Sequence, residues 1–500
     1  MVGLRRITVA VSIALGCVQA AAAASPLEPL VLPPPSPIGP AVQPYVKVSA
    51  QRIALTHVGV IDGTGSPELT DRTIIIENGK IASVSASSAA VPVGVTTLDL
   101  SGHTVIPGIV GMHDHLYYIA RPNVDASGHG EPPLLVPQMT FSAPRLYLAN
   151  GVTTLRTTGS VETYADINVK HSIDAGQLPG PHIDVTGPYL EGADSPFIQM
   201  HRLKDAEDAR KTVAFWAEQG VTSFKAYMNI TRAELKAAIE EAHRRGLKVT
   251  GHLCAVTYPE AAALGIDNLE HGFYVNTQLD PAKTPDVCPS TVGDPTLLAM
   301  DPDGAQAKEL IETLVAHHVA VTSTLPVFEQ MVPGHAPLWP RALDTLTPQA
   351  RNDYLYLRNR TSSLPQDQAH GRVMEFQHDL ALERKFVAAG GLLLAGPDPT
   401  GNGGVIPGFG DLREIELLVE AGFTPPEAIK IATFNGAAYL GLTDHIGSIA
   451  PGKDADLVVV NGDPAHTITD IEKVTIVFKD GVGYDAAALL SSVRGRYGEY

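Results

Sequence analysis

Several residues that could bind metal ions occur in short segments that are otherwise apolar or rich in small residues. They are His113, His115, His252, His271 and Asp398. Imidazole nitrogens and carboxylate oxygens are ligands that Zn²⁺ favours. His113 and His115 are two positions apart, so on a strand they would point to the same side and could bind one ion together. Singly, each residue has an ordinary explanation, such as a hydrogen-bonded histidine or an aspartate in a turn.

A lysine lies in another apolar segment, "VTSFKAYMNI" at residues 221–230, which predicts an inner β-strand. Lysine is almost never fully buried unless it is paired. One explanation for Lys225 is a salt bridge to an acid. Any other explanation must also supply a group that compensates its charge. Tyr227 lies two positions further on, on the same face of the predicted strand.

The middle of the chain, about residues 106 to 440, contains eight strand-like segments that would position these side chains; the first of them begins at residue 104. They are 104–115, 151–159, 182–190, 221–228, 247–254, 266–272, 318–325 and 391–398. Amphipathic segments at 205–220 and 231–246 begin with Asp or Thr and end with Gly, which predicts helices. Alternating strands and helices of this number predict a TIM (β/α)8 barrel, in which active-site residues follow the carboxyl ends of strands. The long runs 273–315 and 326–377 predict helical insertions around the mouth of the barrel.

Both ends of the chain are rich in strands. Residues 48–105 and 441–490 contain β-branched runs separated by Asn-Gly and Asp-Gly turns, which predict hairpins. We expect the two parts to form one small β-sandwich domain, because a barrel brings the ends of its chain together. Residues 491–500 form a C-terminal tail. The overall prediction is an α/β protein with a barrel and a β-sandwich.

The first 24 residues predict a secretory signal peptide, with Arg5 and Arg6, an apolar run and alanines near a cleavage site. The apolar run is too short for a spanning helix, which needs about 20 residues. We therefore expect export to the periplasm or the medium, and regard lipid attachment at Cys17 as the weaker alternative. A proline-rich leader follows at 25–47. Only Cys254 and Cys288 remain in the mature chain, which allows one disulfide at most and leaves their pairing open.

The composition excludes some classes of function. The formal net charge is −18, whereas binding to nucleic acid or to anionic lipid requires a basic face. The sequence lacks a Gly-x-Gly-x-x-Gly motif in a βαβ context and a Gly-x-Ser-x-Gly motif, so neither a dinucleotide site nor a serine-hydrolase elbow is expected.

These segments resemble the amidohydrolase superfamily of metal-dependent hydrolases. "VIPGIVGMHDHL" is similar to its first-strand motif, "HLCAV", "NLEHG" and "LAGPD" resemble its later histidine and aspartate strands, and "IGSIAPGKDADLVVVNGDP" resembles the segment that returns to the β-sandwich. The resemblance covers nearly the whole mature chain. It is nearest to imidazolonepropionase-like proteins, Xaa-Pro dipeptidases and ochratoxinase-like amidases.

The resemblance implies a binuclear centre with two divalent ions, zinc being the expected metal. His113, His115 and Asp398 would bind one ion, and His252 and His271 the other. Lys225 would bind both as N6-carboxylysine, the carbamate formed with CO₂. A hydroxide bridging the metals would attack the substrate carbonyl, Asp398 would transfer the proton, and Tyr227 would polarise the carbonyl.

Two departures from the family pattern concern substrate contacts. Arg156-Thr157-Thr158 replaces the more common Arg-Asp, and Gly396-Pro397-Asp398 replaces Thr-Asp or Ser-Asp. We expect a small-molecule amide as substrate, a dipeptide or an N-acyl amino acid. A cyclic-amide or lactone hydrolase, or a deaminase, is the enzymatic alternative. An inactive binding protein on the same fold is the alternative of another class. No nucleic-acid partner and no membrane insertion after signal removal are expected, and a homo-oligomer is possible.

Overall fold

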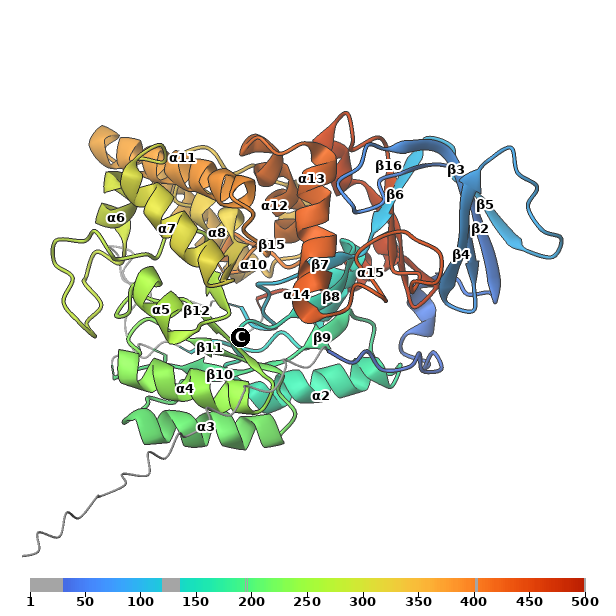
Figure 1. The fold of residues 1–500 in the computed structure, drawn as a ribbon. Helices are drawn as coiled ribbons and strands as arrows, with labels where there is room; N and C mark the ends of the chain where they lie inside the picture. Colours follow the sequence, from blue (N-terminus) through green and yellow to red (C-terminus); the bar gives the residue numbers. More distant parts are fainter. Residues whose placement is uncertain (1–29, 119–134, 194, 196, 401–402, 499–500) are drawn as a thin grey trace, which may run out of the picture.

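The computed structural model describes residues 30–118, 135–193, 195, 197–400 and 403–498 (Figure 1). The predicted signal peptide, including Cys17, and the start of the leader lie outside these residues. From Leu30, whose backbone N–H donates to the Leu440 carbonyl oxygen at 3.0 Å, the leader runs along the folded protein. It ends in a short strand, β1 (Val46–Val48), which pairs with β18 (Val482–Asp485).

Parallel strands in the middle of the chain form two sheets. The smaller sheet has the order β7-β8-β9, and the larger has the order β10-β11-β12-β13-β14-β15. Their bounds are β7 (Ile109–Gly111), β8 (Val152–Arg156), β9 (His182–Asp184), β10 (Thr186–Leu190), β11 (Ser223–Ala226), β12 (Lys248–Gly251), β13 (Asn268–Glu270), β14 (Ala320–Ser323) and β15 (Leu393–Ala395). Each of the eight predicted segments contains a strand of these sheets, and 182–190 contains two, separated at Val185.

The edges of the two sheets meet through isolated contacts. The Met112 N–H, just after β7, donates to the Ala395 carbonyl oxygen at 2.8 Å, and Ser160 and Pro188 form a parallel bridge. The described strands therefore share an α/β arrangement with parallel strands in a ring-like order, but hydrogen bonding does not join them into one closed sheet.

The first predicted strand, 104–115, is wrong in its extent. The chain forms β6 (His103–Pro107), which pairs antiparallel with β16 (Leu457–Asn461), and then β7. Pro107 has no N–H for a ladder, and the Gly108 N–H donates to the Asp456 carbonyl oxygen, so the strand breaks there. As a result His113 and His115 lie in a loop after β7 and not on a strand.

Helices cover the parallel sheets. The two helices predicted from amphipathic segments are present as α3 (Ala206–Glu218) and α4 (Arg232–Arg244), which lie side by side in Figure 1. Asp205 accepts hydrogen bonds from the N–H groups of Glu207 and Asp208, and Thr231 forms a capping box with Glu234. Other covering helices are α1 (Ser142–Ala149), α2 (Thr163–Asp174), α5 (Tyr258–Leu264), α12 (Phe409–Glu420), α13 (Pro425–Lys430) and α14 (Gly436–Leu440).

Both predicted insertions contain helices. The first contains α6 (Asp294–Ala299) and α7 (Ala305–Ala316), and the second contains α8 (Leu325–Glu329), α9 (Pro340–Leu343), α10 (Pro348–Ser362) and the start of α11 (Gln366–Ala388). A Cys254–Cys288 disulfide ties the first insertion to the segment that follows β12. The pairing that the sequence left open is thus present.

Strands from both chain ends form one nine-stranded sheet, seen beside the parallel sheets in Figure 1. Its further strands are β2 (Arg52–Val60), β3 (Leu69–Glu77), β4 (Lys80–Ala86), β5 (Thr96–Asp99) and β17 (Val474–Lys479). Ile53, Ile74, Val459 and Phe478 are fully buried in its apolar core, so residues from both ends pack together. After α15 (Ala486–Ser492) the chain returns to the centre, where Tyr497 is buried against Tyr118. Among the described residues no helix is long and apolar enough to cross a membrane.

Candidate metal centre

The six predicted metal ligands lie at or near the carboxyl ends of five strands. His113 and His115 follow β7, Lys225 is in β11, and the other three come directly or shortly after a strand: His252, His271 and Asp398 follow β12, β13 and β15. All are buried except His252, which is partly exposed. Carboxyl ends of parallel strands meet at one edge, so residues far apart in the sequence come together.

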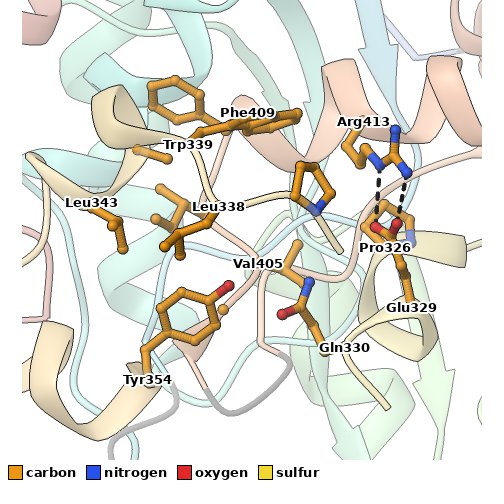
Figure 2. A pocket seen from close by; sticks show the side chains of 15 residues that line it. Pro326, Glu329, Gln330, Leu338, Trp339, Leu343, Tyr354, Val405, Phe409 and Arg413 are labelled. Atoms are coloured by element: carbon orange, nitrogen blue, oxygen red, sulfur yellow. Dashed lines mark hydrogen bonds and ion pairs between the residues drawn. The ribbon is translucent and has the colours of Figure 1, made fainter. Parts of the chain in front are cut away.

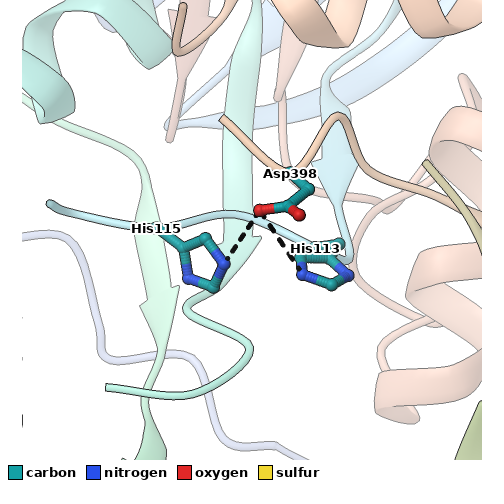
Figure 3. A group of neighbouring side chains, drawn as sticks. All are labelled: His113, His115 and Asp398. Carbon is teal, nitrogen blue, oxygen red and sulfur yellow. Dashed lines mark ion pairs between the residues drawn. The ribbon is translucent and has the colours of Figure 1, made fainter. Parts of the chain in front are cut away.

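Three of these residues form a compact group (Figure 3). The His115 Nε2 atom lies 3.2 Å from the Asp398 Oδ1 atom, and His113 Nε2 lies 3.8 Å from the same oxygen. One ligand atom from each residue falls within 4.8 Å of the other two. Two imidazoles and one carboxylate directed at a common point match the ligand set of a divalent transition metal.

Lys225, His252 and His271 extend this group. Lys225 Nζ lies 3.0 Å from His113 Nε2, and among the described residues no ion pair includes Lys225. The rings of His252 and His271 meet with centroids 4.4 Å apart, and His271 Nδ1 lies 4.0 Å from Asp398 Oδ2. The Nε2 atoms of His252 and His271 are buried without a hydrogen-bond partner in the described structure. Buried polar atoms are normally satisfied, so these two lone pairs fit a bound cation.

Burial sets the charge of these groups. It lowers the pKa of His113 to about 4 and of His252 to about 3, with the Lys225 charge as the next cause, and it lowers the pKa of His271 strongly. Neutral imidazoles are the form that binds metal. Burial lowers the pKa of Lys225 to about 8, while Glu270 and Asp398 oppose the shift. Burial alone would raise the pKa of Asp398, but His113, His115 and His271 bring it well below its usual value, so Asp398 is ionised.

A second layer of residues orients the histidines. His113 Nδ1 lies 2.7 Å from Glu270 Oε2, and Arg156 donates to the other oxygen of Glu270 at 2.9 Å. The His115 Nδ1–H donates to the Thr157 carbonyl oxygen at 3.0 Å. With the proton on Nδ1, the Nε2 lone pair of both histidines faces the ligand group, as second-layer partners of metal-bound histidines require.

Glu270 is the main site residue that the sequence interpretation missed. It is completely buried, and although burial raises its pKa, Arg156 and His113 lower it to about 2, so it is ionised. The signal was present in "NLEHG", where an acid directly precedes His271 in a segment predicted to be a strand. Like Lys225, Glu270 is a charged residue within a segment predicted to be a strand.

The backbone is strained where ligands leave their strands. His271 and Asp398 have φ angles of 71° and 47°, in the left-handed region that non-glycine residues rarely adopt. Such conformations persist only where the surrounding structure enforces them, and they cluster at functional sites. Gly396 meets the loop after β7 so closely that a Cβ atom there would lie 2.2 Å from His113 N. The absence of a Cβ atom at Gly396 thus allows β15 to approach His113.

A cleft with about 870 Å³ of space opens over this group. Tyr227 lines it and contacts His252, with ring centroids 4.9 Å apart. Tyr117 and Tyr189 line it as well, and their hydroxyl oxygens lie 2.6 Å apart. Five of the six candidate ligands line the cleft, all except His113.

A second cavity, with about 430 Å³ of space, lies on the other side of α8 (Figure 2). Its walls are mostly apolar and include Trp339, Tyr354 and Phe409, and the Glu329–Arg413 ion pair closes one side. None of the predicted metal ligands lines it. Its connection with the metal-centre cleft runs through α8, because Glu329 is the last residue of this helix and Phe328 beside it lines the cleft.

Comparison with known proteins decides the family. The model of the amidohydrolase family matches residues 104–482, which is most of the chain. The protein belongs to the amidohydrolase family. The resemblance inferred from the histidine and aspartate segments is therefore confirmed, and the matched range includes all six candidate ligands.

Short segments of the chain are similar to curated enzymes. A Porphyromonas gingivalis imidazolonepropionase is 40% identical over 87 residues, or 16% of this chain and 19% of the relative. An adenine deaminase from Jannaschia sp. is 37% identical over 59 residues, or 12% of this chain and 10% of the relative. The chain thus matches under a fifth of the length of these curated relatives.

Solved structures share the fold over a much larger part of the chain. A Xaa-Pro dipeptidase is similar with a TM-score of 0.63 and 20% identity, covering 87% of this chain and 100% of the other. The A. niger ochratoxinase has a TM-score of 0.61 and 18% identity, covering 87% and 96%. The bottromycin amidohydrolase has a TM-score of 0.65 and 20% identity, covering 91% and 94%. At these identities the similarity establishes the fold alone.

Proposed function

We propose that this protein is a binuclear metal-dependent hydrolase that cleaves an amide bond of a small molecule. The observation that carries the proposal is the convergence of six candidate ligands beneath one cleft, two of them with buried, unpartnered Nε2 atoms. His113, His115 and Asp398 would bind one ion, and His252 and His271 the other. We propose zinc for both, since imidazole with carboxylate is a ligand set that zinc favours.

Lys225 would bridge the two ions as N6-carboxylysine. Its pKa of about 8 gives a useful fraction of free amine near neutral pH, and no described carboxylate pairs with it. The Nζ lone pair would form a bond to the carbon of CO₂, and the nitrogen would lose a proton to water. The product is an anion, so the Lys225 side chain becomes a ligand and is no longer a buried cation without an ion pair.

When bound, the two ions would supply Lewis-acid activation of water and of the substrate carbonyl. The chain's own groups have separate tasks. Asp398 is ionised and would accept the proton of the attacking water and return it to the leaving amine. Tyr227 would donate a hydrogen bond to the carbonyl oxygen from the cleft wall. Glu270 would maintain the orientation of His113.

Several further points belong to this proposal. We propose that the two parallel sheets constitute the (β/α)8 barrel expected from the sequence, interrupted in its hydrogen bonding, with the nine-stranded sheet as the β domain. Residues 1–24 would direct export to the periplasm or medium.

A dipeptide or an N-acyl amino acid remains a candidate substrate, together with neutral amides. The fold relatives named for dipeptides and amides support this choice over the deaminases, which match only short segments.

The test is hydrolysis of a panel of amides by protein purified with zinc and bicarbonate. The panel includes N-acyl amino acids, Xaa-Pro dipeptides, neutral amides, cyclic amides and adenine. Release of an amine from an open-chain amide, lost on metal removal and restored by zinc, is the expected result. Activity on adenine or cyclic amides alone would favour the alternative enzymes. Metal-loaded protein without activity on any member would favour a binding protein.

A further inference from the structure

One wall of the cleft is a small apolar cluster that is separate from the main core. Tyr117, Val136, Val161 and Tyr189 are buried in it, and Phe197, Met200 and Tyr227 pack against it. The Tyr117 ring stacks on His115 with centroids 4.4 Å apart, and Tyr189 meets Tyr227 edge to face at 4.9 Å. This tyrosine wall therefore adjoins the His115 side of the candidate metal centre.

The second apolar wall comes from α8 and the residues after it. Val327, Phe328 and Met331 line the cleft there. Phe328 stacks on Tyr274, with centroids 3.7 Å apart and planes 2° from parallel, and it lies edge-on to His271 at 5.7 Å. Arg413 fixes the end of α8, since it donates to both carboxylate oxygens of the buried Glu329. Phe328 is thus held in position on the His271 side of the centre.

Charged groups are confined to the floor between these walls. Among the described residues that line the cleft, Lys225 and Asp398 are the only acidic or basic side chains apart from histidines, and both belong to the candidate centre. A carboxylate bound against the α8 wall would lose hydration without gaining a partner, and against the tyrosine wall it would meet hydroxyl groups but no cation among the described residues, which is costly. The net charge of −18 also disfavours the approach of anions.

We propose that the substrate is a neutral amide with an apolar group on each side of the scissile bond, one against the tyrosine wall and one against Phe328, and that Phe328 is a specificity-determining residue. This inference rests on the proposed amide hydrolase function. It separates neutral amides from N-acyl amino acids and dipeptides, which carry a free carboxylate next to the bond that breaks.

A matched pair of substrates tests the charge preference. N-(2-phenylethyl)benzamide and N-benzoyl-L-phenylalanine share the same acyl group and phenyl ring and differ by one carboxylate. With zinc-loaded full-length protein, benzoate release measured by chromatography should give a kcat/KM at least about tenfold higher for the neutral amide. A smaller ratio, or a preference for the carboxylate, would overturn the inference and leave the hydrolase function standing. Failure to cleave either, with activity on another open-chain amide of the panel, would overturn the inference alone, whereas failure on the whole panel would contradict the proposed function as well.

Substitution of Phe328 tests the second wall. Phe328→Ala should lower kcat/KM for N-(2-phenylethyl)benzamide by about tenfold, mostly through KM, since an apolar contact of this size supplies 10- to 200-fold discrimination. N-methylacetamide, which has no ring, should lose less than about twofold if it is cleaved at all. Phe215→Ala, an exposed phenylalanine on α3, is the control and should change neither. An equal loss for both substrates, or no loss for the two-ring amide, would refute the role of Phe328. Metal content, measured in parallel, should be unchanged in both variants.

Discussion

Removal of the Glu270 carboxylate should destabilise the protein and weaken its metal centre together. Glu270 is fully buried between Arg156 and His113, at 2.9 and 2.7 Å. The lowering of its pKa from 4.5 to about 2 corresponds to about 3 kcal/mol. Loss of one partner from a buried ion pair costs about 3–5 kcal/mol, because the other charge stays buried. We therefore expect Glu270→Ala to lower the free energy of unfolding by about 3–5 kcal/mol.

The assay is urea unfolding at pH 7, followed by tyrosine and tryptophan fluorescence, with metal content measured on the same samples. Metal affinity should fall by about 10- to 100-fold, since His113 loses the acceptor that fixes its Nδ1 proton. Glu240→Ala is the control, because Glu240 is exposed on α4 and its contact with Lys236 is 3.8 Å long, so its loss should cost under about 1 kcal/mol. If Glu270→Ala is as stable as that control and retains its metal, the assignment of Glu270 as the orienting partner of His113 is refuted.

Three further perturbations probe other parts of the structure. Gly396→Ala should lower metal content and stability, because its Cβ atom would lie 2.2 Å from His113 N. Gly371 has open space around it, so the control Gly371→Ala should lower neither. Equal metal content in the two variants would contradict the close approach of β15. Replacing Cys254 and Cys288 by serine should lower the free energy of unfolding by about 4 kcal/mol, the chain-entropy value for a separation of 34 residues. Urea unfolding of the variant and of the oxidised wild type measures this difference. Equal stability would mean that the disulfide is absent in solution. His335 has a raised pKa, chiefly through its hydrogen bond to Glu329, so its stabilising charge is fully present below pH 6.5 and is lost as pH rises through the raised value. The melting temperature should therefore fall over that range more in the wild type than in His335→Gln, and parallel pH curves would argue against a charged His335.

Local signals in the sequence were sufficient for many of the elements. The helices α3 and α4 were predictable because Asp205 and Thr231 cap their first turns and glycines follow their ends. The strand around Lys225 was predictable because its neighbours are apolar. The histidine and aspartate segments also carried the family resemblance, because these ligands lie in short motifs directly or shortly after strands.

Other features depend on contacts between distant residues. The break between β6 and β7 requires Asp456, which accepts the Gly108 N–H from the far end of the chain. The sequence therefore placed His113 and His115 on a strand that ends before them. The gaps between the two parallel sheets have the same origin, because edge-to-edge hydrogen bonds are set by the packing of the whole fold. Glu270 could have been found from its position in "NLEHG", but its partner Arg156 lies 114 residues away.

Metal stoichiometry tests the central claim most directly. Protein purified with zinc and bicarbonate is analysed by elemental mass spectrometry, beside Lys225→Ala and the control Lys236→Ala, an exposed lysine on α4. The proposed centre predicts two zinc ions per chain in the wild type and in Lys236→Ala, and one or fewer in Lys225→Ala. A wild-type chain with well under one ion, or a Lys225→Ala variant that retains both, would contradict it.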